Sequence, residues 1–276
     1  MRILHASDLH FGMPGVAERV TALETFITSE PLDAIVVSGD LSQRTRRWEF
    51  ERAARFVRLC ESAAPTIVVP GNHDCAWWMN VCGLGSRRAM FSRYRRFIRD
   101  DLEPVLRIPG ATIVGVNSSQ GIQPYTLTMR PRDLSVVGAV RPAQWERARA
   151  AFAAAPASDL RLLVLHHNVL RGSISHRWGL ATRARGMAQA AATGAEVIFS
   201  GHDHGQDAGE ATAEGKRFVV SAAGTLTSRV RGGLPSAWNL VEVSGETIAI
   251  EIREWQREAA SFRAARRAEF ARRPRA

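Results

Sequence analysis

Residues 66–74 read TIVVPGNHD. A short β-branched run ends in a Pro-Gly turn and is followed by the amide of Asn72, the imidazole of His73 and the carboxylate of Asp74. The same arrangement recurs along the chain. Asp8 follows the apolar run at residues 1–7, and Asp40 follows the run at 33–38. Short apolar runs that end in turn residues are typical of buried strands in a largely parallel sheet. This repeated unit predicts an α/β fold.

Further strands and helices alternate along the remainder of the chain. Three more strands are predicted at 111–116, 160–166 and 195–200. Helices are predicted at about 15–29, 46–62, 86–100, 142–154 and 181–192. Beyond residue 205 we expect antiparallel strands at 217–221, 238–243 and 246–252, with a hairpin turn at Ser244-Gly245. The stretch 117–141 has little periodicity, which indicates a loop with a hairpin.

No repeat and no low-complexity linker divides the 276 residues, so one domain over 1–252 is expected. Residues 253–270 are predicted to form a helix with an apolar stripe of Trp255, Ala259, Phe262 and Phe270. The segment 253–276 carries eight Arg and three Glu. We therefore expect a basic C-terminal helix and tail after the main domain.

The net charge of +10 raises the question of an anionic partner. Lys216 is the only lysine, so 36 of the 37 basic residues are arginine, which indicates compositional bias rather than a dedicated binding face. A solvated face is the favoured interpretation of both the tail and the arginine-rich helix at 87–99. Binding of nucleic acid or a membrane by the basic tail is the non-enzymatic alternative.

Other features narrow the class of protein. No apolar run reaches 18 residues, so no transmembrane helix is expected. The apolar stretch at the N-terminus is too short for a signal peptide, and we expect a cytoplasmic protein. The three cysteines, Cys60, Cys75 and Cys82, form no tight pair and are expected to stay reduced.

Five polar clusters each follow a predicted strand: Asp8-x-His10, Gly39-Asp40, Gly71-Asn72-His73-Asp74, His166-His167 and Gly201-His202-Asp203-His204. Ligands of open α/β sheets bind at the carboxyl ends of the strands, so these clusters are expected to meet in one site. Six of the eight histidines lie in them, which argues against unrelated structural histidines. Imidazole and carboxylate groups suit manganese, iron or zinc. A bridging carboxylate between two ions about 3.5–4 Å apart would form a two-metal centre.

This ordered set of motifs resembles the calcineurin-like metallophosphoesterase family over residues 8–204. The resemblance implies a four-layer α-β-β-α sandwich, in which two mixed sheets are flanked by helices. It also implies a hydrolase that uses two divalent metal ions and a metal-bridging hydroxide to cleave phosphoester bonds.

The resemblance assigns a role to each matching residue. Seven side chains would bind metal: Asp8, His10 and His204 the first ion, Asn72, His166 and His202 the second, and Asp40 both. His73 would contact the phosphate and protonate the leaving oxygen. Asp74 is expected to orient His73 or to cap the turn. His166 is preferred over His167 because the ligand comes first in the family pattern, although the proline that usually follows the pair is missing.

The motifs do not identify the substrate, because they hold the metals and not the leaving group. The His-His and Gly-His-Asp-His blocks look similar to the bacterial cyclic-nucleotide phosphodiesterase branch, which favours a phosphodiester and a 3',5'-cyclic nucleotide. A DNA-repair-type nuclease and a nucleotidyl pyrophosphatase are the alternatives. Nucleic acid is the less favoured partner. Repair nucleases of this family usually carry a further domain after the metal-binding motifs, and only about 70 residues follow His204 here. The oligomeric state stays open. Trp77 and Trp78 are expected to pack their loop rather than stack on a base.

Overall fold

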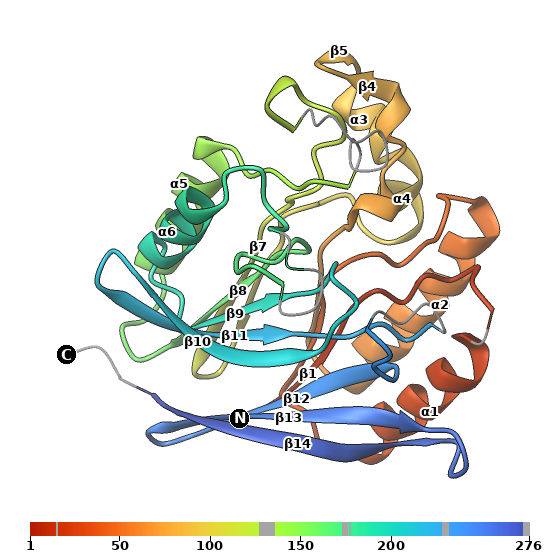
Figure 1. The fold of residues 1–276 in the computed structure, drawn as a ribbon, viewed down its shortest axis with the longest axis vertical. Helices are drawn as coiled ribbons and strands as arrows, with labels where there is room; N and C mark the ends of the chain where they lie inside the picture. Colours follow the sequence, from red (N-terminus) through yellow and green to blue (C-terminus); the bar gives the residue numbers. More distant parts are fainter. Residues whose placement is uncertain (15, 127–135, 173–175, 177, 228–231, 273–276) are drawn as a thin grey trace.

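The computed structural model describes the 276 residues except 15, 127–135, 173–175, 177, 228–231 and 273–276. Two six-stranded sheets lie face to face, and helices cover their outer faces (Figure 1). The predicted four-layer α/β sandwich is therefore confirmed. In the part of the chain that is described, no helix has both the length and the apolar character needed to cross a membrane.

The first sheet has the strand order β14-β13-β12-β1-β2-β3. Its strands are β1 (Arg2–Ala6), β2 (Ala34–Val37), β3 (Thr66–Val68), β12 (Ala237–Ser244), β13 (Thr247–Gln256) and β14 (Ser261–Ala271). The first three pair in parallel, and β12 to β14 add antiparallel strands beside β1. The hairpin predicted at Ser244-Gly245 joins β12 to β13, but Ser244 still pairs with Thr247, so the turn residues are Gly245 and Glu246; Gly245 has a positive φ of 51°.

The second sheet has the order β10-β11-β9-β8-β7-β6. Its strands are β6 (Val105–Ile108), β7 (Ala111–Gly115), β8 (Leu160–Val164), β9 (Val197–Ser200), β10 (Asp207–Ala213) and β11 (Lys216–Ala222). The four central strands are parallel, whereas β6 and β10 are antiparallel edges. These two edge strands are missing from the sequence prediction.

Three apolar cores separate the four layers. Helices α1 (Val16–Ser29) and α2 (Arg47–Ala63) bury Leu23 and Phe50 against the first sheet. The two sheets bury a second core between them, with Ile3, Val36, Ile113 and Val197 among its members. Helices α5 (Pro142–Ala153) and α6 (Ala184–Ala192) cover the second sheet with a third core that includes Trp145, Phe152 and Ala190.

A cap of short elements spans residues 72–97. It contains the 3-10 turns η1 (Asn72–Asp74) and η2 (Trp77–Met79), the hairpin strands β4 (Asn80–Val81) and β5 (Leu84–Gly85), and helices α3 (Arg87–Met90) and α4 (Ser92–Phe97). The single helix predicted at 86–100 is therefore broken, and the break falls at Phe91. Another 3-10 turn, η3 (Pro124–Thr126), lies within the stretch 117–141 in which a hairpin was predicted, and residues 127–135 of that stretch are outside the described chain.

The predicted C-terminal helix is wrong, because residues 253–270 belong to strands. Strand β13 continues across residue 252, and β14 pairs with it on both sides of a register shift between Ile252 and Arg253. Arginine and alanine favour helices by propensity. Here the cross-strand pair Trp255 and Phe262 is buried beside Trp238, and this non-local packing outweighs the local preference. Arg263, Arg266 and Arg267 of the predicted tail thus lie on the edge strand of a sheet.

Candidate metal centre

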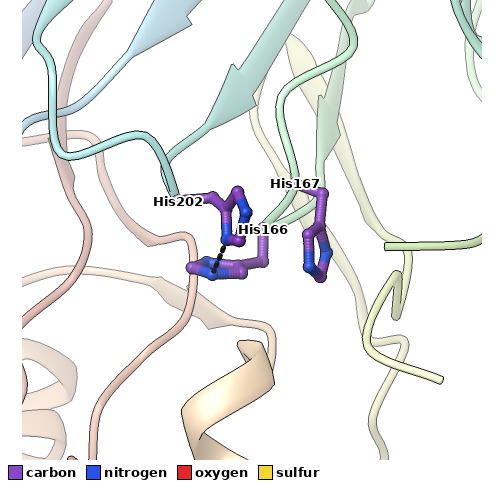
Figure 2. Close-up of side chains that lie close together, drawn as sticks. All are labelled: His166, His167 and His202. Atoms are coloured by element: carbon purple, nitrogen blue, oxygen red, sulfur yellow. Dashed lines mark hydrogen bonds between the residues drawn. The ribbon is translucent and has the colours of Figure 1, made fainter. Parts of the chain in front are cut away.

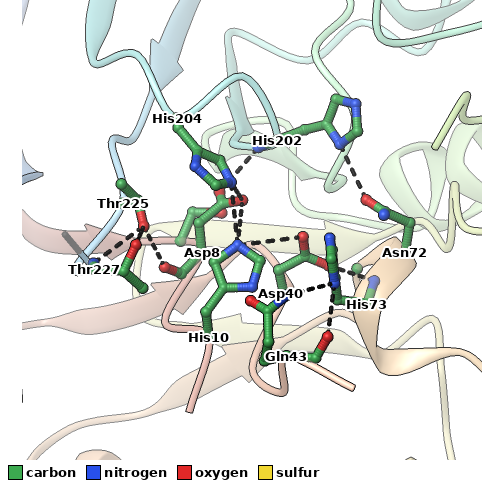
Figure 3. Close-up of polar contacts among 12 residues, drawn as sticks. Asp8, His10, Asp40, Gln43, Asn72, His73, His202, His204, Thr225 and Thr227 are labelled. Carbon is green, nitrogen blue, oxygen red and sulfur yellow. Dashed lines mark hydrogen bonds and ion pairs between the residues drawn. The ribbon is translucent and has the colours of Figure 1, made fainter. Parts of the chain in front are cut away.

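The five polar clusters predicted from the sequence meet at one end of the paired sheets. Asp8, Asp40 and Asn72 follow β1, β2 and β3 of the first sheet, and His166 and His202 follow β8 and β9 of the second. Because all five strands run in the same direction within their sheets, their carboxyl ends present these side chains to a common space (Figure 3).

Glycines allow the loops to approach closely at this edge. A Cβ atom on Gly39 would lie 2.7 Å from the Gly71 nitrogen and 2.8 Å from His166 Nδ1. A Cβ on Gly71 would collide with Asp40, and one on Gly201 would lie 2.5 Å from Asp8 Oδ2. The glycines before Asp40, Asn72 and His202 therefore permit close backbone contact at this edge.

Five of the residues predicted to bind metal have backbones in the left-handed region: Asp8 at φ 53°, His10 at 43°, Asp40 at 53°, His202 at 71° and His204 at 56°. Such conformations cost of order 1–3 kcal/mol for each non-glycine residue and persist where surrounding contacts enforce them. Hydrogen bonds from Asp8 N to Gly39 O (3.0 Å) and from His10 N to Asp40 O (2.9 Å) supply part of this restraint. The concentration of these left-handed conformations at one edge of the sheets points to a functional site.

The first cluster joins Asp8, His10 and His204. His10 Nε2 lies 3.1 Å from His204 Nε2. Asp8 Oδ1 lies 3.6 Å from the former and 3.2 Å from the latter. This oxygen is buried and has no hydrogen-bond partner among the described residues. Three donor atoms that face one point, with an unsatisfied carboxylate oxygen among them, fit a divalent cation.

The second cluster joins Asn72, His166 and His202. Asn72 Oδ1 lies 3.1 Å from His166 Nε2 and 3.1 Å from His202 Nδ1, and the two nitrogens are 3.3 Å apart (Figures 2 and 3). His166 Nδ1 donates to the Ser38 carbonyl at 2.8 Å. This bond fixes the tautomer, so that Nε2 presents its lone pair to the cluster.

His167 lies beside this cluster, and its ring nitrogens come within 4.8 Å of those of His166 and His202. Both nitrogens nevertheless have protein partners. Nε2 donates to the Val136 carbonyl at 2.9 Å, and Nδ1 accepts from the Ser118 hydroxyl at 2.8 Å. Burial lowers the pKa of His167 to about 3, which keeps the ring neutral. Its ring centroid lies 4.4 Å from that of His202 and 5.0 Å from that of His166, but the hydrogen bond drawn in Figure 2 joins only His166 and His202. These contacts favour His166 as the ligand.

Asp40 lies between the two clusters. Its Oδ2 atom is 3.7 Å from His10 Nε2 and 3.3 Å from His166 Nε2. Burial by itself would raise the pKa of Asp40, but the neighbouring His166 and His73 outweigh it and hold the pKa below its usual range. An ionised carboxylate that touches both clusters suits a bridge between two cations. The nitrogen and oxygen donors of the whole set suit manganese, iron or zinc.

His73 lies beside His10 and Asp40, and the three can bring one donor atom each within 4.8 Å of one another. Its ring meets that of His10 edge-on, with 4.8 Å between the centroids. Nδ1 donates to the Gln43 carbonyl at 2.8 Å, and the backbone N–H donates to Asp40 Oδ1 at 2.8 Å (Figure 3). The ring is thereby oriented, and Nε2 is left as the atom available for proton exchange.

Asp74 caps the turn rather than orienting His73. Its carboxylate accepts from the backbone N–H groups of Leu41 (3.1 Å), Ser42 (2.7 Å) and Gly71 (2.9 Å). It therefore ties the loop after β2 to the loop after β3. Of the two roles expected for Asp74, the structure supports the cap, and Gln43 supplies the orienting carbonyl that no motif indicated.

Thr225 is a further residue of the site that carries no sequence signal. Its hydroxyl donates to the Asp8 carbonyl at 2.8 Å and lies 3.1 Å from the Thr227 hydroxyl (Figure 3). The Leu226 N–H also donates to the Asp8 carbonyl, at 3.3 Å. Two donors from one loop thus hold the strained backbone of Asp8. The Thr225 hydroxyl acts on the main chain of Asp8 and not on a metal-binding side chain, so motif spacing could not identify this residue.

Comparisons with known proteins agree with this geometry. A profile of the calcineurin-like phosphoesterase family matches residues 1–206. Purple acid phosphatase PPD1 from yellow lupin (Lupinus luteus) seeds has a similar structure, with a TM-score of 0.69, 11% identity and coverage of 99% of this chain. GAP50, the anchor in the inner membrane complex of Plasmodium, has a TM-score of 0.58 and 11% identity, and the match covers 99% of this chain and 89% of that one.

These structural similarities show the fold alone, because the identities are low. The chain spans about half the length of the lupin phosphatase chain, of which 54% is covered. The search of curated protein sequences found no match.

Proposed function

Given that the chain belongs to the calcineurin-like phosphoesterase family, we propose that it hydrolyses phosphodiester bonds with two divalent cations. The observation that carries this proposal is the position of Asp40, whose Oδ2 atom lies within 3.7 Å of one cluster and 3.3 Å of the other. A carboxylate in this position can bridge two metal ions. Two bound cations lower the pKa of a coordinated water and neutralise charge on the phosphate.

The ligands follow from the two clusters. Asp8, His10 and His204 would hold the first cation, Asn72, His166 and His202 would hold the second, and Asp40 would be shared by the two. Ser38 and Thr225 support this set through the hydrogen bonds to His166 and to the Asp8 backbone. Hydrogen-bond partners of this kind fix the orientation of the metal ligands and increase the affinity for the metal.

His73 serves the reaction without binding metal. Its Nδ1 proton is engaged by the Gln43 carbonyl, so Nε2 is the nitrogen that gains or loses a proton. When protonated, Nε2 donates to the phosphate and then transfers its proton to the leaving oxygen, which prevents an alkoxide from accumulating. The Asp40 carboxylate accepts from the His73 backbone, which ties this acid to the metal bridge.

A 3',5'-cyclic nucleotide is the substrate that we favour. Its support is the similarity of the histidine blocks to the cyclic-nucleotide phosphodiesterase branch. A nuclease and a nucleotidyl pyrophosphatase use the same metal chemistry and are the competing assignments.

A substrate panel tests the proposal. Manganese-loaded protein is mixed with bis(p-nitrophenyl) phosphate, p-nitrophenyl phosphate, cyclic AMP, cyclic GMP, a nucleoside diphosphate sugar and single-stranded DNA. We expect release of nitrophenol from the diester and of a 5'-nucleotide from a cyclic nucleotide. Faster hydrolysis of the monoester than of every diester would overturn the phosphodiesterase assignment. Cleavage of DNA alone would overturn the small-molecule substrate.

A further inference from the structure

The β4–β5 hairpin presents an apolar tip to solvent. Every residue of the run VCGLGSRR at 81–88 is exposed. Leu84 is 82% exposed, and Trp78, Met79 and Val81 beside it are 56%, 44% and 36% exposed. Trp48 is the only other large apolar side chain with such exposure among the described residues. Contiguous exposed apolar side chains of this kind mark an interaction surface. We call Trp78, Met79, Val81 and Leu84 the cap tip.

The cap tip is held in place rather than loosely attached. The Ser86 N–H donates to the Met79 carbonyl at 3.1 Å, which closes the hairpin against η2. The Cys82 N–H donates to the Ile122 carbonyl at 2.8 Å, which ties the turn to the body. Figure 1 shows the hairpin at the top of the molecule, far from both termini. The apolar side chains therefore project from a defined outer edge.

Arginines follow the cap tip in the sequence, on helices α3 and α4. Arg87, Arg88 and Arg96 are exposed, and they follow the hairpin on α3 and α4. A hollow of about 550 Å³ is lined by Arg88, Arg95 and Arg96, with Asp100 as its one acidic residue. Asp100 is already paired with Arg95 at 2.7 Å. The hollow therefore keeps an excess of positive charge that matches phosphate groups.

We propose that the cap tip docks on an anionic phospholipid membrane. The order of the elements favours a lipid surface: the β4–β5 hairpin, which carries the exposed Val81 and Leu84, is outermost, and helices α3 and α4, which carry the arginines, lie between it and the body of the protein (Figure 1). Apolar side chains enter the boundary of the acyl region, whereas arginine side chains stay at the level of the lipid phosphates. A basic cluster beside them adds attraction to negatively charged lipids.

The cap tip is continuous in sequence with the candidate metal centre. Trp77 and Trp78 follow the Asn72–Asp74 turn after only two residues, so the cap tip and the metal ligand Asn72 belong to one continuous segment. The inference goes beyond the proposed hydrolysis and does not depend on it, because binding to vesicles needs neither the metals nor His73.

Co-sedimentation with vesicles tests the proposal. The full chain is mixed with vesicles of phosphatidylcholine alone and of phosphatidylcholine with phosphatidylglycerol. We expect binding to the mixed vesicles that weakens as salt is added, because salt screens the arginines. The double variant Trp78→Ala/Leu84→Asp and the double variant Arg87→Glu/Arg88→Glu should each reduce binding by about tenfold or more.

Matched variants elsewhere on the surface serve as controls. Trp48→Ala removes an exposed tryptophan from α2, and Arg257→Glu/Arg263→Glu makes the same charge change near β14. Both should bind vesicles as the unmodified chain does. Circular dichroism and hydrolysis of bis(p-nitrophenyl) phosphate should be unchanged in the cap-tip variants, which shows that they fold. Absence of binding to the mixed vesicles, or unchanged binding in the cap-tip variants, would overturn the proposal.

Discussion

Nε2 of His10 lies 3.1 Å from Nε2 of His204, although the two residues are 194 positions apart in the sequence. Both nitrogens also face the buried Oδ1 atom of Asp8, which has no hydrogen-bond partner among the described residues. A proton shared between the two rings would satisfy only one pair of these atoms. A cation satisfies all three, and the predictions below follow from that assignment.

Replacing His73 should separate catalysis from metal binding. His73→Asn removes the proton donor but keeps the ligands, so we expect two metal ions per chain and a kcat reduced by about 10²–10⁴-fold. The exposed His176 offers a matched control, and His176→Asn should keep full activity. Metal content by mass spectrometry and initial rates check both points. Loss of metal together with activity would instead make His73 a ligand.

Gly71 should tolerate no side chain. A Cβ at this position would collide with Asp40 Oδ1, so Gly71→Ala is expected to displace the bridging carboxylate and to abolish binding of at least one metal ion. Gly209 has open space around its Cβ position, and Gly209→Ala should leave metal binding unchanged. Isothermal titration with Mn²⁺ measures the difference. Equal affinities in the two variants would contradict the packing described at Asp40.

Thr225 should position Asp8. Thr225→Val keeps the shape of the side chain and removes the hydroxyl that donates to the Asp8 carbonyl at 2.8 Å. We expect the affinity for one of the two metal ions to fall about 10-fold or more, and the free energy of unfolding to fall by about 1–2 kcal/mol. Thr225→Ser restores the donor and should recover both. If the serine variant resembles the valine variant, the hydrogen bond is not the cause.

The sequence was informative about the centre because its chemistry limits the residue types. Carboxylate, amide and imidazole groups suit these ions, and parallel strands bring their carboxyl ends together, so the polar clusters could be expected to meet. The pairing of Asp8 with His204 at one ion was implied by the family resemblance. Gln43 binds His73 through its backbone carbonyl, and Thr225 donates its hydroxyl to the backbone carbonyl of Asp8. Many residue types could make either contact. Such contacts leave no pattern in a single sequence.

The errors in the fold concern segments whose structure depends on distant partners. Residues 253–270 contain many arginines and alanines, which favour a helix locally, but β13 offers a free edge on which they form β14. Strand β10 reads DAGEATA and pairs with β11 at the sheet edge, so it shows no apolar alternation that could reveal it. Strand β6 has only four residues, too few for a reliable period.

His5 should make the free energy of unfolding depend on pH. It is buried between the sheets, 2.9 Å from both the Ser38 and the Ser221 hydroxyls. Burial lowers its pKa from 6.5 to about 3, against the attraction of Asp8. The unfolded chain therefore binds this proton more tightly, so the stability contribution is complete above pH 6.5 and is lost as pH falls toward about 3.

Urea unfolding at several pH values, with EDTA present to remove metals, measures this effect. His5→Asn should show a pH dependence shallower by up to about 1.4 kcal/mol per pH unit in that range. Identical slopes for the two proteins would show that His5 is protonated in the folded state or contributes nothing.

The most direct test of the two-metal centre is a titration of metal-free protein with Mn²⁺ while hydrolysis of bis(p-nitrophenyl) phosphate is followed. We predict no hydrolysis without metal, a rate that reaches its maximum near two equivalents per chain, and no appreciable rate for Asp40→Ala at any concentration. A rate that is maximal at one equivalent, that persists in EDTA, or that survives in Asp40→Ala would contradict a metal pair bridged by Asp40.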